Sequence, residues 1–383
     1  MTETIDAAVP TPAAAELSPT RASALARVMP QDLNPWLARG LLAAFAVVLF
    51  LLPGVLDDPT RVRQWAEYLC YAMIAVGLDI AWGYGGMLAL GQGVFFGLGA
   101  YAMGMHLALE QVPDGQLPQF MSLYSDYTEL PLVWRPFGSF WFAALAAVLV
   151  PMLLAGVLGY LVFHRRLRGA YFALLTQATA VVFGLLLVGQ LKLTAGTNGL
   201  TDFVTIFGRS KYAPGTNHFL YTVSAIALLV LIVLGWQLVH SRFGRLLLAG
   251  RDSEDRVRFL GYNPAFNKAV AFAGPAGMAG IAGALAAPII GIVAPNQFAI
   301  LPSIIMVTWV AIGGRGTLVG AVLGALLVSW GKTTVSESNP DQWLYIQGLL
   351  FVVVVAFVPG GLVGLLRMAG GRVRGLRSRG APA

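Results

Sequence analysis

The sequence predicts an all-α, polytopic membrane protein, a helical bundle of about ten transmembrane helices. Hydrophobic residues make up 57% of the 383 residues and charged residues only 11%, whereas soluble globular domains are about 25% charged. The apolar residues gather in runs near the length of about 20 residues that a helix needs to cross a bilayer. The arginines lie between those runs, as they do in cytoplasmic loops of membrane proteins. Lipid must therefore cover much of the surface.

Ten apolar segments account for the predicted transmembrane helices. They are residues 41–57, 66–84, 88–109, 138–163, 170–190, 219–239, 269–291, 300–313, 317–331 and 344–365. The segments 300–313 and 317–331 are short, so they form either half-helices broken at Gly313-Gly314 or one re-entrant pair. An even number of spans places the N and C termini on the same side of the membrane.

Basic residues place that side in the cytoplasm, because positively charged loops stay inside. The loops on that side and the segment after 365 carry Arg165, Arg166, Arg168, Arg242, Arg245, Arg251, Arg256, Arg258, Lys268, Arg315, Arg367, Arg372, Arg374, Arg377 and Arg379. The outer loop 110–137 holds four acidic residues and one arginine. The outer loop 191–218 carries three basic residues and is the exception to the pattern.

Two tails flank the bundle. Residues 1–37 are rich in Ala, Pro and Thr and hold no apolar core of a signal peptide, so we expect a disordered cytoplasmic tail. Residues 38–366 form the transmembrane domain, and residues 367–383 a basic cytoplasmic tail. The net charge of +7 is explained by topology and by anionic lipid headgroups, not by nucleic acid.

The longest cytoplasmic loop, 240–268, contains a predicted short helix at about 253–260. Its ends are specified by Asp252 or Ser253 as N-cap, Glu254 and Asp255 in the first turn, Arg256 and Arg258 in the last turn, and Gly261 and Pro264 beyond it. The pairs Asp252–Arg256 and Glu254–Arg258 have the favoured i,i+4 order. Such a helix either docks a cytoplasmic motor protein or only orients the two neighbouring spans.

Few polar side chains lie within the spans. Asp79 is a functional candidate because an acid in hydrocarbon is costly, although it lies near the inner end of its span and equally fits a structural partner. Gln92, Gln177 and Asn198 are candidates for lining a translocation path, the alternative being that they hold helices together. A path without a run of charges suits a neutral or zwitterionic solute better than an ion.

Glycines are abundant, with 45 in the chain. Those at 91, 93, 97, 99 and 104 share one span, and Gly320 and Gly324 form a small-xxx-small pair in another. Because close approach of backbones drives helix association in lipid, this spacing indicates helix packing. A narrow path lined by glycine is the alternative.

Several chemical sites are missing from the sequence. The Gly331-Lys332-Thr333 segment lacks the upstream glycine at the spacing of a phosphate-binding loop, so we expect no ATP hydrolysis by this chain. The four histidines are scattered, and the single cysteine, Cys70, lies in an apolar run. We therefore predict no catalytic residue, no metal site and no cofactor of its own.

Five segments carry a family resemblance. They are GLDIAWGYGGMLALGQGVFFGLGAYAMGM (77–105), RGAYFALLTQA (168–178), GTNGLTDF (196–203), SRFGRLLLAGRDSEDRVRFLGYNP (241–264) and GGRGTLVGAVLGALL (313–327). Over about residues 65–366 the chain resembles the branched-chain amino acid (LivM-type) family of ABC transporter permeases. Within that family, WGYGG, DSEDRVRFLGYNP and the insert ELPLVWRPF (129–137) are most similar to a permease subunit of urea transporters (UrtC-like).

The resemblance implies a non-catalytic, multi-pass permease subunit of an ABC importer in the bacterial inner membrane, moving urea or a related small polar solute. It implies a sister permease as heterodimer partner, two cytoplasmic ATPases that bind the ATP, and a periplasmic solute-binding protein facing loops 110–137 and 193–218. The family's ATPase-contacting loop corresponds to Arg251, Asp252, Ser253, Glu254, Arg256, Arg258 and Gly261.

Two alternatives to a urea importer remain open. The same machine would carry branched-chain or other amino acids if its cargo site differs. A secondary transporter or channel would work without ATPases, and the absence of neighbouring genes for a binding protein and two ATPases would favour it.

Overall fold

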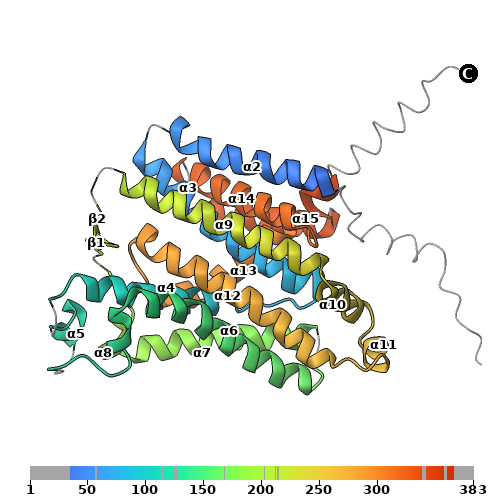
Figure 1. Cartoon of the computed structure of the whole chain (residues 1–383), viewed down its shortest axis with the longest axis horizontal. Coiled ribbons are helices and arrows are strands. Elements are labelled where there is room, and N and C mark those ends of the chain that lie inside the picture. Colours follow the sequence, from blue (N-terminus) through green and yellow to red (C-terminus); the bar gives the residue numbers. More distant parts are fainter. Residues whose placement is uncertain are drawn as a thin grey trace, which may run out of the picture.

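The computed structural model describes residues 35–365 except 57, 114–115, 125–127, 168, 202, 212, 214, 339–341 and 358–359. The predicted tails 1–37 and 367–383 lie almost entirely outside these residues. Helices dominate the described part and run alongside one another as a bundle (Figure 1). The α-helices are α2 Pro35–Val55, α3 Pro59–Asp79, α4 Gln92–Glu110, α5 Gln119–Tyr124, α6 Phe140–His164, α7 Ala170–Gly189, α8 Leu191–Thr194, α9 Thr216–His240, α10 Arg242–Asp252, α11 Glu254–Phe259, α12 Pro264–Ile290, α13 Ile300–Gly313, α14 Leu318–Ser338 and α15 Trp343–Phe357.

Short elements complete the described chain. They are a π-helix, η1 (Ile80–Tyr84), two 3₁₀-helices, η2 (Arg135–Gly138) and η3 (Pro295–Phe298), and an antiparallel hairpin of β1 (Thr205–Ile206) and β2 (Arg209–Ser210). The hairpin, α5 and α8 lie at one end of the bundle, and α10 and α11 lie at the other (Figure 1). We call these the hairpin end and the α11 end.

Each of the ten predicted segments contains a helix of the structure. By length and hydropathy five of these helices are able to cross a membrane: Phe140–His164, Ala170–Gly189, Thr216–His240, Pro264–Ile290 and Leu318–Glu337. Three shorter helices, Leu42–Val55, Ile300–Gly313 and Tyr345–Val354, are also apolar. The chain is therefore an all-α membrane protein, while the number of spans and the side of the termini stay predictions.

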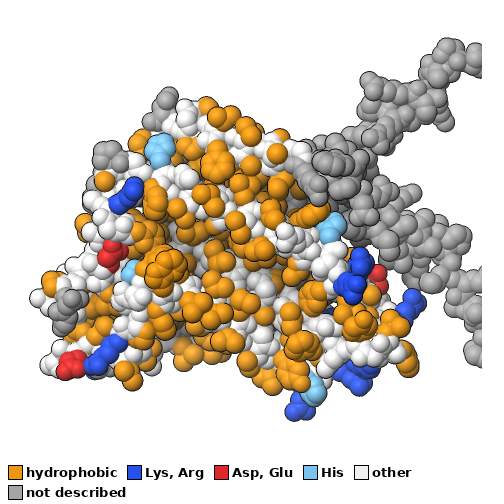
Figure 2. All heavy atoms as spheres, viewed as in Figure 1, with side chains coloured by type: hydrophobic (Ala, Val, Ile, Leu, Met, Phe, Trp, Pro, Cys, Tyr) orange, Lys and Arg blue, Asp and Glu red, His pale blue; other side chains and the backbone are white. Residues whose placement is uncertain are grey.

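Buried helices differ from lipid-facing ones. The central helices α3, α4 and α12 are largely buried, and α12 packs against α3, α4 and α6. The helices α6 and α7 instead expose rows of large apolar side chains such as Leu153 and Leu185. Hydrophobic side chains cover the middle of the visible face, and Lys and Arg lie toward its two ends (Figure 2). This distribution fits a bilayer around the middle of the bundle.

Glycines bring the central helices into close contact, as the sequence predicted. A Cβ at Gly283 of α12 would overlap the carbonyl oxygen of Phe96 in α4, and a Cβ at Gly99 would overlap the carbonyl of Gly280. In the same way, Gly324 of α14 packs on the backbone of α13. Packing, not a glycine-lined path, is thus the role of these residues.

Two predicted segments differ in detail from the structure. The segment predicted at 66–84 is helical to its predicted end at Tyr84, but it begins earlier, at Pro59, and its last turn, from Ile80, is the π-helix η1. The short segment 317–331 extends as α14 to Ser338, and within the extension the hydroxyls of Thr333 and Thr334 donate to carbonyls one turn earlier. The Gly331-Lys332-Thr333 segment is accordingly helical and not a loop.

Candidate functional site

The short helix predicted at about 253–260 is present as α11 (Glu254–Phe259), with Ser253 as its N-cap, and a second helix, α10, precedes it. Ser241 begins α10, and its Oγ accepts a hydrogen bond from the Gly244 N–H at 3.3 Å. Ser253 has extended backbone angles (φ −157°, ψ 102°), which separate α10 from α11. Sequence analysis missed α10, although Ser241 was an available N-cap signal.

The end of α11 is built as the sequence predicted. Gly261 has a φ of +85°, and its N–H donates to the Arg258 carbonyl at 2.9 Å. The N–H of Tyr262 donates to the Val257 carbonyl at 3.3 Å, which completes a Schellman motif. Pro264 does not act as a stop, because it is the first residue of α12.

The charged pairs of this segment differ from the predicted ones. Asp252 pairs with its neighbour Arg251 at 3.2 Å, because the extended Ser253 removes Asp252 and Arg256 from a common helix. Glu254 forms an ion pair with Lys268 of α12, and both side chains are largely buried. This pair ties α11 to α12.

Apolar side chains are exposed at the C-terminal end of α11 and at the start of α12. Phe259 is 92% exposed and Leu260 73% exposed, and Tyr262 and Phe266 are exposed beside them. We call these four residues the apolar tip. Arg256 and Arg258, also exposed, flank it. Exposed aromatic residues beside arginines are typical of protein–protein contact sites.

Arg251 points from α10 back into the bundle. Its Nη1 donates a hydrogen bond to the carbonyl oxygen of Gly83 in η1 at 2.7 Å. Its aliphatic part lies against Gly86, whose φ of +69° and missing side chain permit the approach. Sequence analysis assigned Arg251 to the docking loop, but no local pattern indicated a partner 168 residues away.

Asp79 and the α13–α14 loop meet beside η1, the element that Arg251 contacts. Asp79 is fully buried, and its Oδ1 accepts a hydrogen bond from the Gly316 N–H at 2.6 Å. The Arg315 guanidinium donates to the Trp82 carbonyl at 3.0 and 3.3 Å and lies over the Trp82 ring. Burial and the nearby Arg251 lower the pKa of Arg315, while Asp79 opposes the shift. Asp79 thus has a structural partner.

The structure brings two of the path candidates near each other. Gln92 is buried at the start of α4, and its Nε2 donates to the Pro275 carbonyl at 3.4 Å. Its neighbour Gly91 packs on the backbone of Thr176, which precedes the half-buried Gln177. Asn198 is exposed in the loop after α8. Gln177 lies about 18 Å of helix before the end of α7, so Asn198 is remote from it. Path lining stays a prediction for all three.

The family match decides the class of protein. The family described as "Branched-chain amino acid transport system / permease component" matches residues 62–355. The chain belongs to this family. Its membrane bundle is therefore that of a transport permease, and α10–α11 is part of the permease.

Similar permeases occur among well-described bacterial proteins. The permease is 28% identical over 321 residues to the high-affinity branched-chain amino acid transport system permease protein LivM of Salmonella typhimurium, covering 78% of this chain and 69% of that protein. It is 27% identical to LivM of Escherichia coli over the same shares. The autoinducer 2 import system permease protein LsrC of Yersinia pseudotuberculosis is 29% identical over 211 residues, 49% of this chain and 60% of that protein. No solved structure matches.

A cavity lies between the α10–α11 junction of the permease, the C-terminal end of α6 and the N-terminal end of α7. It has a volume of about 350 Å³ and is lined by Met87, Phe163, Phe172, Arg251, Glu254 and Lys268, among others. Four of its charged side chains form the pairs Arg251–Asp252 and Glu254–Lys268. The junction is therefore attached here through Arg251 and through the Glu254–Lys268 pair.

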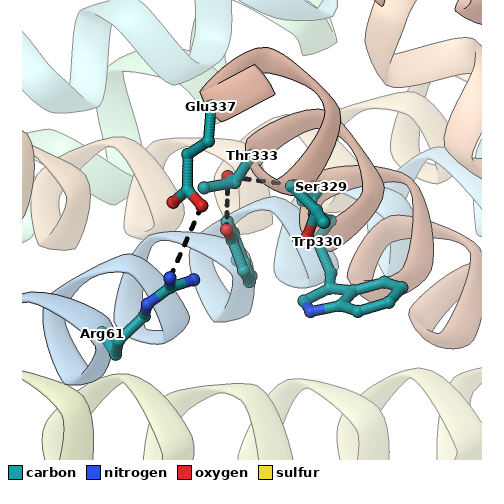
Figure 3. A network of polar contacts seen from close by, with 7 residues as sticks. Arg61, Ser329, Trp330, Thr333 and Glu337 are labelled. Atoms are coloured by element: carbon teal, nitrogen blue, oxygen red, sulfur yellow. Dashed lines mark hydrogen bonds and ion pairs between the residues drawn. The ribbon is translucent and has the colours of Figure 1, made fainter. Parts of the chain in front are cut away.

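The hairpin end of the permease carries a second polar cluster between α3 and α14 (Figure 3). Arg61 pairs with Glu337 at 3.5 Å, and Thr333 donates to the Ser329 carbonyl at 3.3 Å. The Tyr68 hydroxyl donates to Thr333 Oγ1. Since Asp79 also bonds the loop before α14, polar contacts join α3 and α14 near both ends.

Proposed function

We propose that this permease is the membrane-embedded subunit of an ABC importer in the bacterial inner membrane. One observation carries the proposal: the apolar tip, which is exposed beside Arg256 and Arg258, lies where α11 joins α12, and α11 lies at one end of the bundle (Figure 1). An apolar surface of this kind is stabilised by covering it. The proposed cover is an ATPase subunit that binds and hydrolyses the ATP, so that this chain is non-catalytic and holds no cofactor.

The remaining partners follow from this arrangement. A sister permease completes the membrane part, and a second ATPase docks on it. The periplasmic solute-binding protein docks at the hairpin end, where α5, α8 and the β1–β2 hairpin lie (Figure 1). Both termini then lie in the cytoplasm, on the side of α11.

The proposed cargo is a small neutral or zwitterionic solute. The buried polar side chains of the described residues are mainly amides and hydroxyls, including Gln92, Thr176, Thr308 and Gln347, and such groups bind a solute without net charge. Because LivM proteins are named for branched-chain amino acid transport, a branched-chain amino acid is the first candidate. Urea is the second, supported by the motif DSEDRVRFLGYNP.

Purification of the permease with its partners tests the proposal. We expect two ATPases and a sister permease to copurify, and solute-loaded binding protein to stimulate ATP hydrolysis in proteoliposomes. Competition between labelled leucine and labelled urea then identifies the cargo. Accumulation of solute by the permease without ATPases would instead show a secondary transporter, and the proposal would be wrong.

A further inference from the structure

Arg251 belongs to two parts of the permease at once. Its backbone lies in the last turn of α10, two residues before the extended Ser253 that separates α10 from α11. Its guanidinium reaches the core, where it donates to the Gly83 carbonyl at 2.7 Å. Hydrogen bonds from a charged donor are shorter and stronger than neutral ones. The segment that carries the apolar tip is thus directly bonded to η1, which continues α3.

We infer that Arg251 is a positioning residue that transmits movement of α10–α11 to η1 and α3 during transport. This inference rests on the proposed function, because it requires an ATPase that moves the docking segment. Arg251 acts on η1 through the Gly83 carbonyl and has no contact with solute.

The π-helix η1, whose Gly83 carbonyl accepts the hydrogen bond from Arg251, is suited to this role. A π-helix is a local departure from α-helical geometry and often lies at functional sites. The last carbonyls of a helix lack partners within the helix and attract cations. Arg315 donates to the Trp82 carbonyl of η1 and Arg251 donates to the Gly83 carbonyl, so guanidinium groups from the α13–α14 loop and from α10 hold neighbouring residues.

Helix α3, which η1 continues, carries the movement across the bundle. Thirteen of the 21 residues of α3 are buried, and α3 packs against α9, α12, α13 and α14. At its far end, Arg61 and Tyr68 bind Glu337 and Thr333 of α14. Near η1, Asp79 binds the backbone of Gly316. A displacement of η1 therefore moves α3 and α14 together.

The experiment compares three variants of the complete complex in proteoliposomes. Arg251→Met removes the bond to Gly83, and Arg251→Lys keeps one charged donor. Arg245→Met is the matched control, since Arg245 lies exposed on the same helix and its side chain forms no hydrogen bond or ion pair with the described residues. Copurified ATPase, ATP hydrolysis and solute taken up per ATP are measured for each.

We expect the Arg251→Met complex to retain its ATPases and to hydrolyse ATP. The amount of solute taken up per ATP should fall about tenfold or more, because the variant lacks a charge-assisted hydrogen bond. Arg251→Lys recovers part of this ratio. Arg245→Met leaves it unchanged. A purely structural role would reduce the amount of complex and not the ratio.

Three results would overturn the inference. They are an unchanged ratio in Arg251→Met, an equal fall in Arg245→Met, and loss of the ATPases from Arg251→Met complexes, which would make Arg251 a docking residue. If the Arg251→Met protein does not accumulate in the membrane, amide hydrogen exchange tests the inference instead. The backbone amides of residues 85–87 must then exchange faster in Arg251→Lys than in Arg245→Met. A wild-type complex that takes up solute without ATP would instead contradict the proposed function.

Discussion

Replacing Phe259 by serine is expected to weaken ATPase binding without altering the bundle. Phe259 is 92% exposed in the isolated permease, so the substitution removes almost no packing inside the chain. Complete burial of a Phe side chain stabilises by about 1.5–3 kcal/mol. A loss of about 2 kcal/mol at the interface raises the Kd by about 30-fold.

Titration of the purified ATPase onto the permease and its sister subunit in nanodiscs measures that Kd. The matched control is Leu132→Ser, because Leu132 is 79% exposed in the segment before η2, far along the sequence from α11. We expect the control to bind the ATPase as the wild type does. An unchanged Kd for Phe259→Ser, or an equal rise for Leu132→Ser, would refute the assignment of the apolar tip to docking.

Three further substitutions test the contacts within the bundle. Asp79→Ala leaves the half-buried Gly316 N–H without its carboxylate partner and should destabilise by about 1–3 kcal/mol, seen as a lower thermal unfolding temperature in detergent. Gly283→Ala should destabilise by about 1–3 kcal/mol in the same assay because its Cβ overlaps the α4 backbone, whereas Gly274→Ala on the same helix meets open space. Arg61→Met should change stability by less than about 1 kcal/mol, since its ion pair is half exposed.

Each of these expectations has a contradicting result. An Asp79→Ala protein as stable as Asp79→Asn would show that the hydrogen bond to Gly316 contributes little. Equal unfolding temperatures for Gly283→Ala and Gly274→Ala would refute the close approach of α4 and α12. A large loss of stability in Arg61→Met would show that the hairpin-end cluster is a principal stabilising contact.

The sequence by itself determined the membrane class, the helical character of the apolar segments and the end of α11. Hydropathy determines the first two, because hydrocarbon selects long apolar helices wherever they occur. The Schellman motif at Gly261 was predictable because all its hydrogen bonds lie within six residues. The motifs between 77 and 327 also indicated the permease family that residues 62–355 match.

Only the tertiary structure decided how the docking segment is joined to the core. The bond from Arg251 to Gly83 spans 168 residues and ends on a backbone carbonyl, which every residue possesses, so no residue type marks the acceptor. Likewise, Asp79 finds its partner in the backbone of Gly316, 237 residues later. Periodicity and capping report interactions within one or two helical turns, whereas these contacts exist only after the helices have packed.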